Sequence, residues 1–553
     1  MDSTVDLLIL NGKVFTSDST HPYAEAVAIT GNRIVFVGSD AEAQALRSSA
    51  KRILDAQGGT VMPGFIDSHF HLRVGSVELQ NADLVDVNSL GSLESTLRKY
   101  AQENPASLWV NGSNIHYEIF PEGSNERLTR HHLDAIISDR PVAVMAYDHH
   151  VLWANTRALE ISGTLHGMKT AANTEIVMGA DGLATGEVRE PDAYMRVLSH
   201  TGAWGRAMGA LVGYKMSAPT ADELARQREA VRKGSVLAVK HGVTSVHNMD
   251  GDFDQASLYA AMEDSGELPL RVYVPYSVTP DTNENDLRQA VEMRRHFQSE
   301  MVRAGSVKFF MDGIVEAWTA LLTEEYATRP GWKGDAMYSA DHFTRMTVAA
   351  DKLGLQIIVH AIGDAAVRRT LDGYEAALKA NGRRDSRHRV EHIELIHPDD
   401  LARFADLGVI ASMQPYHRVP EAGMVWAQNI PSYRWKNAFA WQTIRNSGAH
   451  MAFGSDWPVV TLNPMQGFDS AINYHPWQPE LPMQGQSLED TLHAYTRDAA
   501  YAEFQENQKG QIRVGYFADV VILSTDIERI PAENYLDVHP VLTICDGRIV
   551  FEK

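Results

Sequence analysis

Both ends of the chain alternate short β-prone runs with turn signals. The first sixty residues hold four such runs, and Asn11-Gly12 and Gly31-Asn32 lie between them as hairpin signals. The last forty residues follow the same pattern, with Asp546-Gly547 between two runs. Because chain termini often lie close together, we expect one small β domain built from both ends. The expected strands are 5–10, 13–16, 26–29, 33–37, 520–523, 541–545 and 548–551.

The middle of the chain alternates apolar runs with helical stretches, as in βα units around a parallel sheet. Eight apolar runs qualify as strands, and eight is the number that closes a barrel. Two further runs, 108–113 and 142–148, fall in a long stretch from about 72 to 235, which we interpret as an insertion after the first barrel strand. The eight expected barrel strands are 65–70, 243–247, 271–276, 306–311, 356–360, 389–394, 409–413 and 451–455.

Composition narrows the class of protein. The 553 residues are 44% hydrophobic and 22% charged, close to a globular average, which excludes long disorder and fibrous repeats. The net charge of -21 argues against nucleic acid and anionic lipid as partners. Cys545 is the one cysteine, so neither an intrachain disulfide nor a thiolate zinc site can form. With no signal peptide and no apolar run of membrane length, we expect a cytoplasmic enzyme with a small-molecule substrate and no membrane partner.

The first candidate for chemistry is the pair His69 and His71. Side chains on a strand repeat every two residues, so both imidazoles lie on one side, at the carboxyl end of the first barrel strand. Among 23 histidines, chance alone supplies roughly one such pair. The pair therefore needs support from elsewhere in the chain.

That support comes from four polar residues, each at the end of a different expected strand. They are Lys308, His360, His392 and Asp456, on strands four, five, six and eight. A polar side chain in such a place is costly to bury unless it is paired or ligated. Any one of them alone could be a satisfied core residue, but five strand ends meeting at one barrel mouth favour a metal site.

Imidazole and carboxylate ligands without thiolate suit Zn²⁺, and also Mn²⁺, Fe²⁺ or Co²⁺. Lys308 is unexpected here, because an ammonium group is repelled by metal ions. Burial and nearby cations lower the pKa of a lysine, and the neutral amine can react with CO₂ to form a carbamate that bridges two metals. The alternative is a structural ion pair between Lys308 and Asp312 or Glu316.

These motifs resemble those of the amidohydrolase superfamily, in order along the chain. The opening motif is PGFIDSHFH at 63–71, and the others are VKFFMDG, VHAIGD, VEHIEL and FGSDWPV. More narrowly, DHHVLWAN at 148–155 and TGEVRE at 185–190 resemble the YtcJ-like branch, which includes N-substituted formamide deformylases. GQIRVGYFADVVIL at 510–523 resembles the usual return into the small β domain.

The resemblance implies a distorted (β/α)₈ TIM barrel over 63–496 and a β-sandwich from 1–62 and 497–553. It also implies two metal ions, with His69, His71 and Asp456 on one, His360 and His392 on the other, and carbamylated Lys308 as a bridge. Enzymes of this kind commonly form dimers or larger homo-oligomers. One departure is the run from Ile314 to Trp318, where many relatives carry small residues, so a substrate cannot simply be carried over.

The expected reaction is hydrolysis of an amide-type C–N bond, with N-formyl or N-acyl amines as first candidates. A metal-bridging hydroxide attacks the carbon, and Asp456 takes up its proton and delivers it to the departing nitrogen. The same ligands would also serve a lactone, ester, phosphoester or deaminable ring. The alternative outside enzymes is a metal-bearing scaffold without activity.

Residues for substrate binding are harder to select. His150 follows an apolar run of the insertion and is a candidate to bind substrate or to orient a carbonyl, though a buried structural role fits equally. Trp318, with Trp332, is a candidate wall of an apolar pocket, although aromatic side chains belong more often to the core. Asp364 fits a supporting residue or a helix cap. His116, His247, His397 and His417 have no motif context and are expected to be ordinary surface or core residues.

Overall fold

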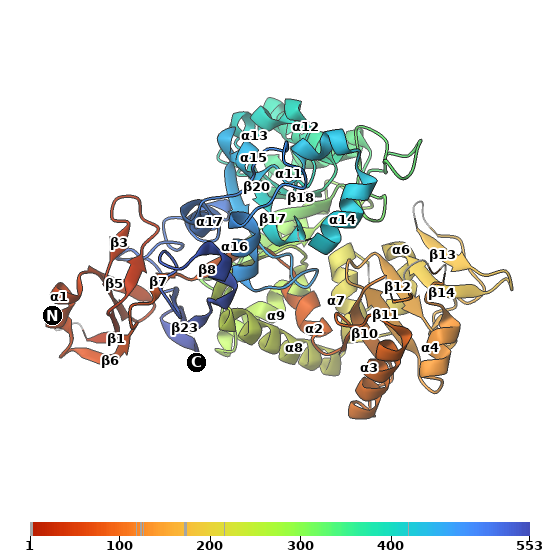
Figure 1. Cartoon of the computed structure of the whole chain (residues 1–553), viewed down its shortest axis with the longest axis horizontal. Coiled ribbons are helices and arrows are strands. Elements are labelled where there is room, and N and C mark those ends of the chain that lie inside the picture. Colours follow the sequence, from red (N-terminus) through yellow and green to blue (C-terminus); the bar gives the residue numbers. More distant parts are fainter. Residues whose placement is uncertain are drawn as a thin grey trace. The chain divides into compact units, whose positions relative to one another are not determined.

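The computed structural model describes residues 4–117, 119–121, 124, 126–170, 174–214, 216–418 and 420–553, with the side chains of 420–424 outside the description. The chain forms two compact units. The first comprises 1–70, 235–456 and 461–553, and the second comprises 71–234 and 457–460. The first unit contains the barrel and both chain ends, and the second contains most of the predicted insertion (Figure 1).

The first unit is built around an eight-stranded parallel sheet, as predicted. Neighbouring strands pair in the order β21-β20-β19-β18-β17-β16-β15-β8. The two outer strands are joined by hydrogen bonds: Ser68 Oγ donates to the Phe453 carbonyl at 2.6 Å, and the Asp456 amide donates to the His69 carbonyl at 2.7 Å. The sheet is therefore a nearly closed barrel. Its strands are β8 (Phe65–Phe70), β15 (Val243–Asn248), β16 (Arg271–Ser277), β17 (Val302–Phe310), β18 (Gln356–Ala361), β19 (Arg389–His392), β20 (Ile410–Met413) and β21 (His450–Phe453).

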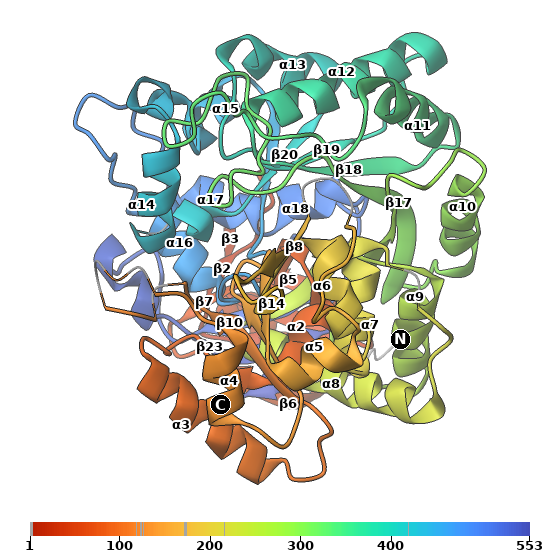
Figure 2. The same ribbon diagram turned by 90° about the vertical axis from the view of Figure 1, so that its right-hand side faces the viewer.

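Helices between the strands cover the outside of the barrel, and α11 (Ala340–Lys352) shows why they form. Ser339 caps its N-terminus by accepting the His342 amide, and the buried positions Phe343, Met346 and Ala350 recur at helical spacing. Phe343 packs edge-to-face on Phe309 of β17, with ring centroids 5.5 Å apart. Figure 2 shows α11, α12 (Asp364–Asn381) and α13 (Leu401–Leu407) on the outer side of β18, β19 and β20. Other helices of the barrel are α9 (Phe253–Asp264), α10 (Leu287–His296) and α15 (Trp441–Asn446).

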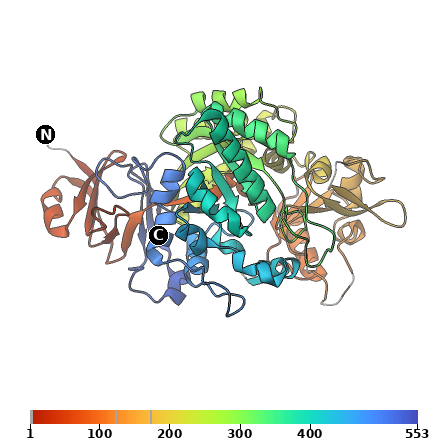
Figure 3. The same ribbon diagram turned by 90° about the horizontal axis from the view of Figure 1, so that it is seen from above.

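The chain ends form two further sheets: one of four strands, all N-terminal, in the order β5-β4-β1-β6, and one of six strands. The six-stranded sheet joins the C-terminal strands to N-terminal ones in the order β24-β23-β22-β7-β2-β3, and in Figure 3 the blue C-terminal segment lies beside the red N-terminal segment. Ile9 and Val27 of one sheet share a core with Val61 and Ile522 of the other. The strands are β1 (Val5–Leu10), β2 (Lys13–Phe15), β3 (Tyr23–Ala24), β4 (Ala26–Thr30), β5 (Arg33–Gly38), β6 (Ala50–Asp55), β7 (Thr60–Pro63), β22 (Val520–Leu523), β23 (Pro540–Cys545) and β24 (Arg548–Glu552).

The second unit has its own six-stranded sheet, in the order β13-β14-β12-β11-β10-β9. The predicted strands 108–113 and 142–148 correspond to the parallel neighbours β10 (Val110–Ile115) and β11 (Val142–Ala146). The other strands are β9 (Ala82–Asp83), β12 (Val151–Ala154), β13 (Glu175–Met178) and β14 (Ala184–Arg189). Among the residues that the structure describes, no helix has both the length and the apolar character that a membrane crossing requires.

Candidate active site

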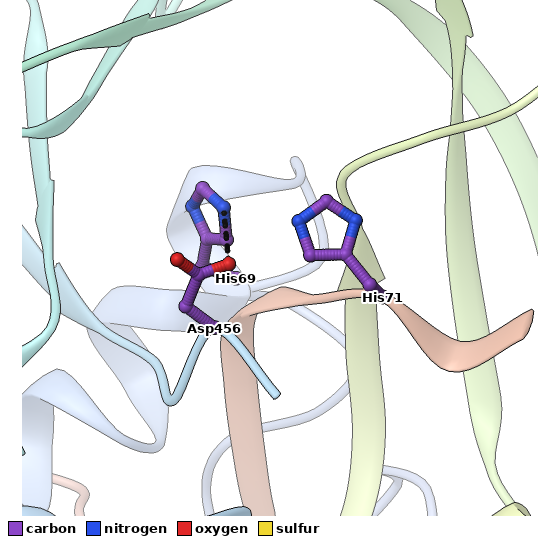
Figure 4. A group of neighbouring side chains, drawn as sticks. All are labelled: His69, His71 and Asp456. Atoms are coloured by element: carbon purple, nitrogen blue, oxygen red, sulfur yellow. Dashed lines mark ion pairs between the residues drawn. The ribbon is translucent and has the colours of Figure 1, made fainter. Parts of the chain in front are cut away.

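Three of the predicted ligands meet where β8 and β21 end. His69 and Asp456 are buried, and His69 Nε2 lies 3.2 Å from Asp456 Oδ1. His69, His71 and Asp456 each offer a ligand atom, and these atoms all lie within 4.8 Å of one another (Figure 4). This group of two imidazoles and one carboxylate can hold a divalent metal ion.

A second group lies on the other side of the Asp456 carboxylate. His392, His417 and Asp456 also place one ligand atom each within 4.8 Å of the others. The His360 ring lies edge-on to the His392 ring, with centroids 4.3 Å apart. Burial, reinforced by the charge of Lys308, holds the pKa of His360 well below its ordinary value. Burial likewise holds the pKa of His392 well below its ordinary value, so the two adjacent imidazoles predicted from strands five and six both favour the neutral form.

Lys308 lies on β17 with a side chain that is completely buried. Its Nζ has no hydrogen-bond partner among the described residues, and it stands 4.9 Å from the centre of the Phe310 ring. Burial lowers the pKa of Lys308 to about 8, although the Glu391 and Asp456 carboxylates act in the opposite direction. The predicted alternative, an ion pair with Asp312, is not formed: the Asp312 oxygens accept backbone amides from Ile362, Gly363 and Leu321.

Sequence reasoning missed a buried ion pair that supports His69. Glu391 Oε2 lies 2.7 Å from His69 Nδ1, and Arg389 donates to both Glu391 oxygens at 2.9 and 3.2 Å. The same guanidinium reaches Ser412 Oγ and, at 2.8 Å, His247 Nδ1. Burial opposes ionisation of Glu391, but Arg389 and His69 outweigh it and lower the pKa of Glu391 to about 2. Glu391 is thus a carboxylate that fixes the His69 ring with Nε2 toward Asp456.

His417 is the second residue that sequence reasoning missed. It was expected to be an ordinary surface or core residue, but it lies in the short 3₁₀ turn η3 (Pro415–Arg418) after β20, and its Nε2 is 3.5 Å from Asp456 Oδ2. Its Nδ1 is 3.4 Å from Glu394 Oε1. Burial disfavours the charged form, but Glu394 and Asp456 raise the pKa of His417 above its ordinary value.

The backbone at these strand ends adopts unusual conformations. Asp456, His392 and Ile393 have φ values of 66°, 72° and 52°, in the left-handed region that side chains other than glycine rarely adopt. Such residues cluster at functional sites, where surrounding contacts hold the strained conformation in place. Gly454 allows β21 to approach β8 closely, since a Cβ there would lie 2.4 Å from the His69 amide nitrogen.

The two predicted substrate contacts lie in different units. His150 belongs to the second unit, and its Nδ1 lies 3.0 Å from a Glu190 carboxylate oxygen. Trp318 belongs to the first unit, where its indole N–H lies 3.0 Å from Thr328 Oγ1 and 3.1 Å from Asn429 Oδ1. Its carbonyl accepts the Trp332 indole N–H at 2.8 Å. Through these contacts Trp318 stabilises the segment that follows β17, the strand that carries Lys308.

Asp364 has the supporting role that its motif suggested. Its carboxylate accepts the Thr323 amide at 3.0 Å and receives the Arg434 guanidinium at 2.6 Å. It therefore anchors the same loop that carries Trp318. A carboxylate with these partners holds structure and is not available as a ligand.

Comparison with known proteins agrees with this geometry. The model of the amidohydrolase family matches residues 52–551. The chain belongs to the amidohydrolase family. It is accordingly a metal-dependent hydrolase by family, and the resemblance to the YtcJ-like branch is confirmed.

Individual proteins are similar to this chain over most of its length. Protein LONG AFTER FAR-RED 3 of Arabidopsis thaliana is 31% identical over 540 residues, which cover 94% of this chain and 87% of that one. N-substituted formamide deformylase of Arthrobacter pascens is 25% identical over 562 residues, with 99% and 98% covered. The crystal structure of an uncharacterized metal-dependent hydrolase from Pyrococcus furiosus is also similar, with a TM-score of 0.71, 25% identity, and 93% of this chain and 98% of that one covered.

The residues present fit the metal ions that family membership implies. Nitrogen and carboxylate donors gather around Asp456, and the buried amine of Lys308 and both ring nitrogens of His392 make no hydrogen bond within the described part of the chain. Polar atoms buried in this way cost free energy unless a ligand satisfies them. A metal ion would satisfy the imidazole nitrogens among them.

Proposed function

We propose that this amidohydrolase cleaves an amide-type C–N bond, with N-formyl or N-acyl amines as its substrates. The single observation that carries the proposal is the buried Asp456 carboxylate with His69 Nε2 on one oxygen and His417 Nε2 on the other. A carboxylate in that position can both bind metal and move a proton. The similarity to N-substituted formamide deformylase supports an amide as the first substrate class to try.

In the proposed site, His69, His71 and Asp456 hold one divalent ion, and His360 and His392 hold a second. The neutral amine of Lys308 would add to CO₂, which forms an N–C bond and releases a proton. The resulting carbamate would carry one negative charge shared by two oxygens, and these oxygens would serve as the further metal ligands. When bound, divalent ions of this kind lower the pKa of water and polarise a carbonyl oxygen. Zn²⁺ is the first candidate, with Mn²⁺, Fe²⁺ and Co²⁺ as alternatives.

The proton path follows from the position of Asp456. Its carboxylate takes the proton of the attacking water and delivers it to the departing amine nitrogen, which cannot leave as an anion. Glu391 lies 2.7 Å from His69 Nδ1 and so holds the ring with Nε2 toward Asp456. Asp456 follows the carboxyl end of β21, the end of a barrel at which such enzymes carry out their chemistry.

Substrate selection is proposed to involve His150 and Trp318. Glu190 contacts His150 at Nδ1, and this ion pair fixes the orientation of the His150 ring within the second unit. Trp318 is partly exposed, with its N–H anchored, so its ring face offers an apolar contact to a substituent on nitrogen.

The test is a panel of N-formyl amines, N-acyl amines, lactones, carboxylic esters and phosphotriesters, assayed with zinc-loaded protein and with chelator-treated protein. We expect metal-dependent turnover of the amides. Turnover confined to lactones, esters or phosphotriesters would reject the amide proposal and keep the hydrolase. Asp456→Asn should lose nearly all turnover while it retains much of the bound metal, and a variant as active as wild type would remove the role of Asp456 in proton transfer.

A further inference from the structure

Two histidines face Asp456 in the same way, one at each carboxylate oxygen. His69 Nε2 lies 3.2 Å from Oδ1, and His417 Nε2 lies 3.5 Å from Oδ2. The other nitrogen of each ring faces a glutamate: His69 Nδ1 is 2.7 Å from Glu391 Oε2, and His417 Nδ1 is 3.4 Å from Glu394 Oε1. Each imidazole is therefore held by a carboxylate behind it, with its Nε2 aimed at Asp456.

Both glutamates come from one short segment. Glu391 lies in β19, and Glu394 follows two residues after that strand ends at His392. The positive φ values of His392 and Ile393 turn the chain between the two glutamates. Such a conformation persists only where surrounding contacts enforce it. This one segment thus supplies the imidazole of His392. It also supplies a carboxylate for each neighbouring histidine, Glu391 for His69 and Glu394 for His417.

Glu394 is itself held in place. The buried indole N–H of Trp426 donates to Glu394 Oε2 at 3.0 Å, so that Oε1 is the oxygen turned toward His417. His417 in turn stacks on the His392 ring, with centroids 5.6 Å apart and planes 26° apart. The ring of His417 is thus fixed by a carboxylate on one edge and an imidazole on its face.

A carboxylate on the far nitrogen is the arrangement that metal-binding histidines usually show, because it sets the tautomer and strengthens the donor nitrogen. His392, His417 and Asp456 form one of the two candidate metal groups found among the described residues. We propose that His417 is a metal ligand that shares an ion with His392 and Asp456. Glu394 and Glu391 are positioning residues, which aim His417 and His69 at ions on the two sides of Asp456.

This inference rests on the proposed metal-dependent hydrolysis and adds to it. The ligand set that the family resemblance implies has no contribution from the turn after β20, the seventh barrel strand. With His417, that turn supplies a fourth imidazole beside Asp456, and the ion held with His392 gains a nitrogen ligand that His360 and His392 alone do not provide.

The experiment uses the full-length chain loaded with Zn²⁺ and compares His417→Ala with His397→Ala. His397 is a suitable control because it comes from the same region and pairs only with Asp399 at the surface among the residues described. Metal content is measured by plasma mass spectrometry, and zinc affinity by competition with a chelator. We expect His417→Ala to lose one ion or to bind it at least a hundredfold more weakly, and Glu394→Gln to weaken it by about ten- to a hundredfold. His397→Ala should equal wild type.

A second readout separates a metal ligand from a substrate contact. The visible absorption of the Co²⁺-substituted protein reports ligand number and type, so it should change in His417→Ala and stay unchanged in His397→Ala. Unaltered zinc content, affinity and Co²⁺ spectrum in His417→Ala overturn the inference, even if turnover falls. If His417→Ala does not fold, as judged by circular dichroism, His417→Gln and Glu394→Gln carry the same comparison. A wild-type protein that binds no divalent ion would reject the proposed function itself.

Discussion

The buried pair of Arg389 and Glu391 allows a quantitative test of how the barrel supports its site. Both side chains are fully buried and are joined at 2.9 Å. Removal of one member leaves the other charge buried without its partner, which costs about 3–5 kcal/mol. Glu391→Gln and Arg389→Met should each lower the free energy of opening of the barrel by this amount. The double variant removes both charges and should lose less than the sum of the two, so the pair shows a coupling of roughly 2 kcal/mol or more.

Hydrogen exchange of the amides in β19, measured by mass spectrometry, is the appropriate assay, because a chain with two compact units need not unfold in one step. Since each 1.4 kcal/mol is a factor of ten, protection in β19 should fall about a hundredfold or more in each single variant. Arg295 and Glu292 are the matched control, an exposed pair with the same 2.9 Å separation, and their variants should change protection by less than threefold. Strictly additive losses at Arg389 and Glu391, or losses as small as those of the control, would refute the reasoning.

Two further predictions concern neighbouring parts of the same unit. Glu503→Gln leaves the buried Lys509 without the carboxylate that lies 2.5 Å away. The free energy of opening of β15, measured by hydrogen exchange at neutral pH, should therefore fall by about 3 kcal/mol. Burial opposes ionisation of Glu503, but Lys509 and His247 lower its pKa to about 2 from an ordinary 4.5. The stability that Glu503 contributes is therefore present above about pH 4.5 and disappears as the pH falls toward 2. If the difference in stability between wild type and Glu503→Gln grew on acidification, the sign of this argument would be wrong. Gly454→Ala places a methyl group against the His69 amide and should weaken zinc binding. Gly91→Ala is the control for the added methyl group, because a Cβ there meets no neighbour and the backbone is not left-handed, and it should leave zinc binding as in wild type.

The barrel was predictable because its strands are buried on both faces. Such strands appear in the sequence as continuous apolar runs, and all eight occur within a few residues of their expected positions, the largest difference being β17, which begins at Val302 and not at 306. The strand β6 was missed for the opposite reason: in AKRILD most positions are exposed or partly exposed and charged residues interrupt the run. The four-residue β7 ends in Pro63, which local patterns favour as a turn.

The candidate site was predictable where a polar residue ends an apolar strand. Because parallel strands end at one face of a barrel, that signal selected six residues: His69 in β8, His71 just after it, Lys308, His360, His392 and Asp456. Glu391 and Arg389 gave no such signal, since two charges inside a strand become reasonable only when each neutralises the other. His417 lies in a turn without motif context, and its partner Glu394 is 23 residues away in the chain. Pairings over that separation depend on the fold and cannot be derived from local pattern.

The central claim is a two-metal site bridged by a modified Lys308. Metal content per chain, measured by plasma mass spectrometry on protein expressed with zinc and bicarbonate, tests it most directly when wild type is compared with Lys308→Ala. The account predicts about two ions per wild-type chain and a clear fall in the variant. About one ion in both proteins would contradict it and make Lys308 a structural residue beside a single metal.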